Sequence, residues 1–316
     1  MPDRGNNLIA VTEVDLTSEL QGYAEPVVFG VGTDGSVYAI ARKYVESLVE
    51  EYGVNVFSKG QLTTPVEHLI VRWQAGKVDS TVVVSESLVG SYAQPHPEGV
   101  LLVGARCHWS PQGPETNAVV IDWQGKIVRR MTLGDGIEDV RVSPDGTIWV
   151  SYFDEGVFGN YGWNDPGPAG IGAPGLVAFS PSGEVRRRYQ PAEAGTDDIC
   201  DAYAVNVVGN DDVWVYFYVD FPIVNLREGG YRVWDPAVAG SRALAVKGER
   251  VLLLGDYADP DLGYIVELGA AGQARQIQTR RLVDEGGQSL GEARCIGVGS
   301  NLYAFSGRRV LVVRDW

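Results

Sequence analysis

The chain has 316 residues, of which 45% are hydrophobic, and its formal net charge at pH 7 is −15. This length and apolar content are sufficient for a large folded core, which excludes a mostly disordered chain. The negative charge disfavours nucleic acid or an anionic membrane surface as the main partner, because either would repel the chain. We therefore expect a folded protein that binds neither nucleic acid nor membrane.

The sequence contains no apolar stretch of the ~20 residues needed to span a bilayer. Its first residues lack the pattern of a secretory signal. Cys107, Cys200 and Cys295 are widely separated and odd in number, so we expect small buried side chains rather than disulfides or a zinc site. These features predict a cytoplasmic protein.

A hairpin pattern recurs six times along the chain: a short apolar run, a tight turn and a second apolar run. The clearest copies are FGVGTDGSVYAI at 29–40, VRVSPDGTIWVSY at 140–152 and VNVVGNDDVWVYFY at 205–218. Looser copies lie at 95–104, 243–255 and 295–305. One hairpin alone cannot bury its apolar face, so the repeat predicts an all-β, six-bladed β-propeller.

Two further strands are expected after most hairpins, which completes a four-stranded blade. The predicted single domain spans residues 1–316. The last hairpin is followed by only one strand, at 308–316, so the apolar run at 7–16 is expected to supply the missing outer strand and close the ring. The blades are then predicted at 17–86, 87–133, 134–190, 191–240, 241–284 and 285–316.

Two segments depart from this pattern. In the fourth blade YRVWDP at 231–236 is expected to be the third strand, and little sequence remains for a fourth. Seven blades remain the alternative if residues 44–64 contain a further hairpin. Part of that segment, KYVESLVEEYG at 43–53, instead has apolar residues at helical spacing and a terminal glycine, which predicts a helix.

The connections between strands are unequal in length, and this indicates which face carries function. Turns between first and second strands are minimal, whereas connections between second and third strands are long. Long loops on a rigid scaffold commonly build binding sites. The long connections are expected at residues 43–67, 107–117, 153–175, 219–230 and 256–263.

Aligning the hairpins gives the residues expected at the mouth on this face. Carboxylates dominate the set, which suits a hard cation or general acid–base chemistry. Candidate catalytic residues are Glu138, Asp139, Asp201 and His108; candidate metal ligands are Asp139, Asp154, Asp201 and Asp220. Alternatively, these acids bind backbone amides, pair with arginines or face solvent. The cofactor is left open, with Ca²⁺ or Mg²⁺ as the candidate ions. Other residues expected at the mouth are Glu25, Lys43, Gln94, Glu155, Asp256, Tyr257 and Glu292.

Aromatic side chains in the same loops suggest a surface for a flat or sugar-like ligand. They are concentrated at 153–175, where glycines and prolines alternate with them, so the loop could also close as a lid. A self-packed cap is the alternative. The predicted ligand-binding residues are Tyr92, Phe153, Tyr161, Trp163, Tyr203, Phe221, Arg242 and Arg294.

SPDGTIWVSY at 143–152, with LVAFSPSGEV at 176–185, resembles the blade motif of the six-bladed propellers that include gluconolactonase-like and strictosidine-synthase-like proteins. It is also similar to the repeats of seven-bladed streptogramin lyases. The resemblance is closest in the third blade and extends to the rest only as a pattern. It implies a divalent metal over the central channel, with a part for Glu138, Asp139, Asp201 and Asp220.

The sequence therefore supports two classes of function at the long-loop face. The first is small-molecule binding, with metal-assisted hydrolase, lyase or isomerase chemistry as its catalytic form. The second is a non-catalytic propeller that binds a protein or glycan. A small polar molecule or a protein is the expected partner, and the oligomeric state is not predicted.

Overall fold

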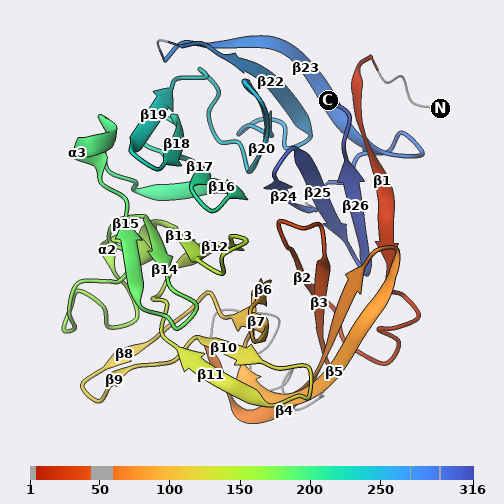
Figure 1. Cartoon of the computed structure of the whole chain (residues 1–316), viewed down its shortest axis with the longest axis vertical. Coiled ribbons are helices and arrows are strands. Elements are labelled where there is room, and N and C mark those ends of the chain that lie inside the picture. The colour runs from red at the N-terminus through yellow and green to blue at the C-terminus, as the bar shows by residue number, and fades with distance from the viewer. Residues whose placement is uncertain (1–4, 44–59, 271, 292) are drawn as a thin grey trace. The chain divides into compact units, whose positions relative to one another are not determined.

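The computed structural model describes residues 5–43, 60–270, 272–291 and 293–316, and nearly all their regular elements are β-strands (Figure 1). The chain divides into two compact units: Thr17–Tyr189, called the middle unit, and Met1–Leu16 with Gln190–Trp316, called the terminal unit. No helix in the described part of the chain is long and apolar enough to cross a bilayer. The helix predicted at 43–53 lies outside the described residues except for its first residue. Glu292 also lies outside them.

The middle unit contains three four-stranded antiparallel sheets. In each sheet the first two strands form the predicted tight hairpin. The strands are β2 (Val28–Val31), β3 (Val37–Arg42), β4 (Gln61–Gln74) and β5 (Lys77–Leu88); β6 (Tyr92–His96), β7 (Gly99–Val103), β10 (Ala118–Ile121) and β11 (Ile127–Met131); and β12 (Ile137–Val142), β13 (Ile148–Tyr152), β14 (Leu176–Phe179) and β15 (Val185–Arg188).

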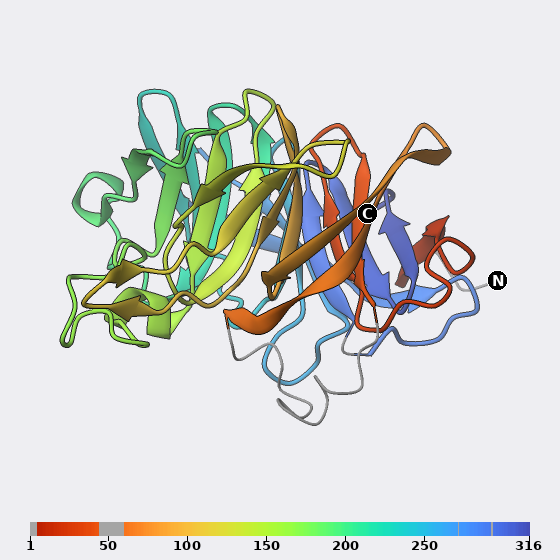
Figure 2. The ribbon, with the colours of Figure 1, turned by 90° about the horizontal axis from the view of Figure 1, so that it is seen from below.

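Four short elements lie in the connections of these sheets and of the terminal unit. Strands β8 (Trp109–Ser110) and β9 (Gly113–Pro114) form a hairpin that lies beside the β13–β14 connection in both views (Figures 1 and 2). The Trp109 amide donates to the Tyr161 carbonyl at 2.9 Å, which ties the two loops together. The helices α2 (Asp154–Phe158) and α3 (Pro191–Ala194) are each about one turn long.

The terminal unit contains one four-stranded and one eight-stranded sheet. The larger sheet consists of two antiparallel groups of four strands joined by β1. The smaller sheet contains β16 (Asp201–Gly209), β17 (Asp212–Tyr218), β18 (Ile223–Arg227) and β19 (Gly230–Trp234). One group of the larger sheet contains β20 (Ala243–Lys247), β21 (Arg250–Leu254), β22 (Leu262–Leu268) and β23 (Ala274–Asp284). The other group contains β24 (Arg294–Val298), β25 (Asn301–Ser306), β26 (Arg309–Val313) and β1 (Asn7–Asp15).

The predicted closing strand is confirmed. Strand β1 pairs antiparallel with β26 over Val11–Asp15 and parallel with β23 over Asn7–Ala10, so it lies between them in the sheet. The number of blades in a complete ring remains a prediction.

The prediction for the fourth blade was wrong in its strand order. Residues 231–236 contribute the fourth strand, β19, and the third strand is β18, within the segment predicted to be a loop. That segment contains Asn225, whose side chain is fully buried and donates to Asp212 Oδ1 at 2.7 Å. The side-chain nitrogen of Asn225 is thus paired within the sheet, whereas its Oδ1 has no hydrogen-bond partner among the described residues.

Inner strands are buried on both faces, and their sequences are continuously apolar for that reason. In the terminal unit β16, β20 and β24 pack against one another so closely that a Cβ added at Gly297 would overlap the Leu244 carbonyl oxygen. Asn206 lies between the same strands, where its amide donates to the carbonyls of Leu244 at 3.1 Å and Gly299 at 2.8 Å. Outer strands are polar: β15 is VRRR and largely exposed.

Candidate functional site

The loop-bearing end of the terminal unit carries an exposed group of aromatic rings, which we call the aromatic patch: Tyr203, Tyr218, Phe221 and Tyr257. Phe221 lies at its centre, with ring centroids 5.1 Å from Tyr203, 5.9 Å from Tyr257 and 5.7 Å from Tyr218. Tyr203 and Tyr257 meet Phe221 edge to face, the arrangement that aromatic quadrupoles favour. Their hydroxyls lie 2.9 Å apart, within hydrogen-bond distance.

The patch combines a buried base with an accessible rim. Phe221 is 8% exposed, whereas Tyr218 is 46% and Tyr257 is 68% exposed. Neighbouring exposed apolar side chains, unlike isolated ones, commonly mark binding sites. The rings are thus fixed by one another and still available to a ligand.

The backbone that presents Phe221 is strained. Asp220 and Phe221 have φ angles of 63° and 52°, in the left-handed region that non-glycine residues seldom occupy. Consecutive strained residues persist only where their surroundings hold them, and they are frequent at ligand sites. Burial raises the pKa of Tyr203, and the neighbouring Tyr257 raises it further. The charge of Asp201 contributes in the same direction, so Asp201 lies close to Tyr203.

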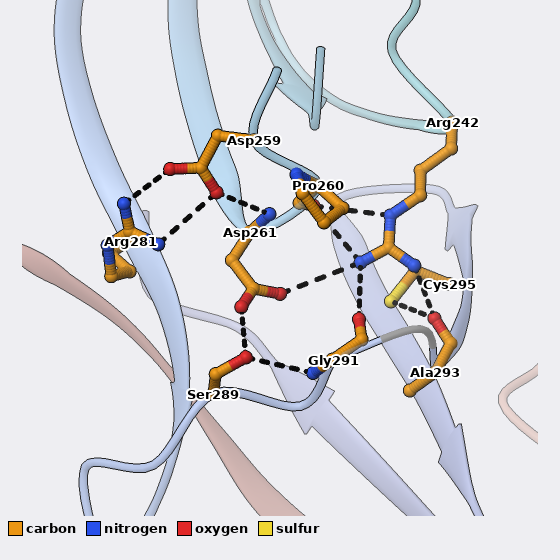
Figure 3. Close-up of polar contacts among 9 residues, drawn as sticks. All are labelled: Arg242, Asp259, Pro260, Asp261, Arg281, Ser289, Gly291, Ala293 and Cys295. Atoms are coloured by element: carbon orange, nitrogen blue, oxygen red, sulfur yellow. Dashed lines mark hydrogen bonds and ion pairs between the residues drawn. The ribbon is translucent and has the colours of Figure 1, made fainter. Parts of the chain in front are cut away.

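Next to the patch along the β21–β22 loop is a charged network, drawn in Figure 3. Arg242, which precedes β20, donates from Nε and Nη2 to the Pro260 carbonyl at 3.2 and 3.0 Å and from Nη1 to the Ala293 carbonyl. Its guanidinium therefore links the β21–β22 loop to the β23–β24 loop. Arg242 lies at the predicted end of its strand, but these contacts assign it to holding loops in place.

Two aspartates of the β21–β22 loop complete this network. Asp261 is buried, accepts a hydrogen bond from the Ser289 hydroxyl and has Oδ1 3.7 Å from Arg242 Nη2. Asp259 pairs with Arg281 on β23, and this bond lowers the pKa of the Asp259 carboxyl. Cys295 on β24 is buried, which raises the pKa of its thiol to about 11 and makes the thiol unreactive. The network positions the loop that carries Tyr257.

The middle unit has its own polar centre at its loop-bearing end, built around Arg106. The guanidinium bridges Asp135 at 2.9 Å and Glu155 at 2.5 Å, and it lies 4.2 Å from the ring centroid of Tyr161. Arg106 Nε is buried with no hydrogen-bond partner in the described part of the chain. Burial raises the pKa of Asp135, against the opposing effect of the Cys107 amide and Arg106. Sequence reasoning missed both Arg106 and Asp135.

Several predicted site residues of the middle unit hold structure together. Trp163 is 5% exposed and its indole N–H donates to the Cys107 carbonyl at 2.8 Å. The Tyr92 hydroxyl donates to the backbone carbonyls of Ile137 and Glu138. The Trp163 contact matches the alternative in which the aromatic loop at 153–175 is a self-packed cap.

The remaining aromatic and histidine candidates of this unit surround Arg106. The Tyr161 ring stacks on the guanidinium, and the more distant Phe153 ring has its centroid 5.4 Å from it. The exposed His108 contacts Tyr161 edge to face, with 5.4 Å between the ring centroids. In the terminal unit, the last candidate, Arg294, lies 5.9 Å from the Phe305 ring centroid.

The four predicted metal ligands fall in different units. Asp139 and Asp154 belong to the middle unit and Asp201 and Asp220 to the terminal unit. Asp139 forms a buried ion pair with Arg141 at 2.8 Å, and Asp154 accepts from the Glu155 amide. Within the described ranges, no three His, Cys, Asp or Glu side chains form a group that could hold a metal ion. Metal-assisted catalysis by these residues remains a prediction.

Comparison with known proteins gives a partial family match and distant structural likeness. The profile of the YxzG family matches residues 176–312, less than half of the chain. No curated protein matches the sequence.

A crystal structure of a functionally unknown protein from Desulfotomaculum acetoxidans is 10% identical, with 88% of this chain and 78% of that chain covered and a TM-score of 0.50. A calcium-binding regucalcin from Agrobacterium tumefaciens is 11% identical, with coverage of 98% and 91% and a TM-score of 0.45. A streptogramin B lyase is 9% identical, with coverage of 92% and 93% and a TM-score of 0.42.

The four-stranded antiparallel sheets, each with a tight-turn end and a loop-bearing end, define an all-β protein of the β-propeller class. At these identities the likeness concerns the fold alone.

Proposed function

We propose that this propeller binds a small polar molecule with a flat or sugar-like face on the aromatic patch of the terminal unit. The observation that carries the proposal is the exposure of Tyr257 and Tyr218 around the buried ring of Phe221. A flat ring or the C–H face of a sugar that covers these side chains removes apolar surface from water, which favours binding. The side chains need not rearrange, because the rings already hold one another in place.

The polar groups at the patch support selection of a ligand with hydroxyls or amines. Tyr203 and Tyr257 present two linked hydroxyls, each able to donate and accept. The nearby Asp201 carboxylate and the net charge of −15 favour neutral or cationic molecules over anions. Binding alone accounts for these groups.

Tyr257→Ala is expected to weaken ligand binding at least about tenfold, because it removes the most accessible aromatic ring of the patch. The side chain is 68% exposed, so the fold should be unaffected. Saturation-transfer NMR against methyl glycosides and nucleosides, followed by titration of the best probe, measures the effect.

Phe158→Ala is the matched control, since Phe158 is 61% exposed but lies on α2 of the middle unit. Equal affinity of the wild type and Tyr257→Ala for the probe, or an equal loss in Phe158→Ala, would argue against the patch. Tyr257→Phe separates stacking from hydrogen bonding, because it keeps the ring and removes the hydroxyl.

A further inference from the structure

A cavity lies in the terminal unit where β1 changes partners, and we call it the β1 fork. Strand β1 pairs with β23 up to Ala10 and with β26 from Val11 onward. The cavity at this change has a volume of about 190 Å³ and is lined by Asn7, Ile9, Val11, Arg280, Val312, Arg314 and Asp315. One water needs only roughly 10–15 Å³ on this measure. The fork therefore has room for a small organic molecule.

Two arginines supply the polar part of the cavity. Arg280 Nε is buried and has no hydrogen-bond partner among the described residues, while its Nη2 donates to Gln278 at 3.2 Å. Arg314 pairs with Glu13 at 2.7 Å, and its side chain is still 51% exposed. Both arginine side chains line the cavity, so they supply positive charge that favours an anion there. The carboxylate matches the planar guanidinium fork best.

Apolar side chains supply the rest of the lining. Ile9 and Val11 lie two residues apart on β1 and so point to the same face of the strand. Val312 is paired with Val11 and is almost fully buried, whereas Val11 is 41% exposed. An alkyl group placed here would cover Val11. The lining thus matches a molecule with one charged end and one apolar end.

We propose that the β1 fork binds a small organic acid, with its carboxylate on Arg280 and Arg314 and its alkyl tail on Ile9, Val11 and Val312. This site is separate from the aromatic patch and favours the opposite ligand charge. Asp315 is the one acidic side chain in the lining, and it limits affinity by repelling the carboxylate.

Calorimetric titration of the full chain with 4-methylpentanoate, acetate and inorganic phosphate tests the proposal. The branched acid is expected to bind, and acetate at least about tenfold more weakly, since each buried CH₂ contributes about 0.8 kcal/mol. Arg280→Gln should reduce affinity for 4-methylpentanoate about tenfold or more, Val11→Asp should abolish binding, and Asp315→Asn should increase affinity severalfold.

Arg275→Gln is the matched control, because Arg275 is on the same strand with its side chain 75% exposed and paired with Glu267. It should leave affinity unchanged, and circular dichroism of every variant should match that of the wild type. The proposal is overturned if the wild type gives no heat with millimolar 4-methylpentanoate, if phosphate binds equally well, or if Arg275→Gln loses as much affinity as Arg280→Gln.

Discussion

Gly297→Ala is expected to lower the free energy of unfolding by about 3 kcal/mol or more. The added Cβ would overlap the carbonyl oxygen and carbon of Leu244, so β24 and β20 would have to separate. Separation would also disturb Asn206, whose carbonyl accepts from the Gly299 amide at 2.8 Å and whose amide donates to Leu244. Urea denaturation followed by tryptophan fluorescence measures the loss, since the stacked Trp214 and Trp234 lie in the same unit.

Gly209→Ala is the control for this experiment. Its added Cβ would meet only the Asp212 Cβ, at 4.0 Å, and Gly209 does not occupy the positive-φ region. We expect a change below about 1 kcal/mol. Similar losses in the two variants would mean that the close approach of β20 and β24 does not limit stability.

Arg106→Met is expected to cost about 3–5 kcal/mol at pH 7, the usual effect of removing one partner of a buried ion pair. Asp135 is 3% exposed, and without Arg106 its carboxylate would keep only hydrogen bonds such as that from the Cys107 amide at 2.7 Å. Arg186→Met is the control, because Arg186 and Asp145 are both well exposed and 3.7 Å apart. We expect less than about 1 kcal/mol there.

The loss in Arg106→Met should depend on pH in a defined direction. Burial already raises the pKa of Asp135 in the folded protein, and removing the guanidinium raises this pKa further. Because the folded-state pKa of Asp135 is raised, protonation of this carboxyl stabilises the folded protein. This contribution to the free energy of unfolding is fully present below the unfolded-state pKa of about 4 and is lost as the pH rises through the folded-state pKa. Unfolding measured between pH 4 and pH 8 should show the variant approach the wild type at the acid end. Adding Asp135→Asn should remove this dependence, and a pH-independent deficit would contradict the assignment.

The strands were predictable because their patterns are local. Each tight hairpin combines apolar runs with a turn, and the unpaired edge of the last hairpin indicated that residues 7–16 must pair with it. The error in the fourth sheet lies in assigning residues 223–227 to a loop, whereas their burial depends on pairing with β17. A single sequence contains no record of that pairing.

The site was harder to predict because exposure is a tertiary property. Trp163 and Tyr257 both lie in long aromatic loops, yet one indole is buried against the Cys107 carbonyl and the other ring is 68% exposed. Arg106 was missed since no motif surrounds it, and its role arises only where Asp135 and Glu155 converge on it. Loop length indicates which end of the sheets is the candidate functional end, but it does not show which side chains there remain accessible.

The pairing of β1 also sets the order in which the two units can fold during synthesis. The middle unit is a continuous segment, so its three sheets can form as soon as residue 189 has left the ribosome. Strand β1 is made first but pairs with β23 and β26, which are made more than 250 residues later. Until then its apolar residues are exposed in the nascent chain, where they are open to chaperones and to mispairing with other edges.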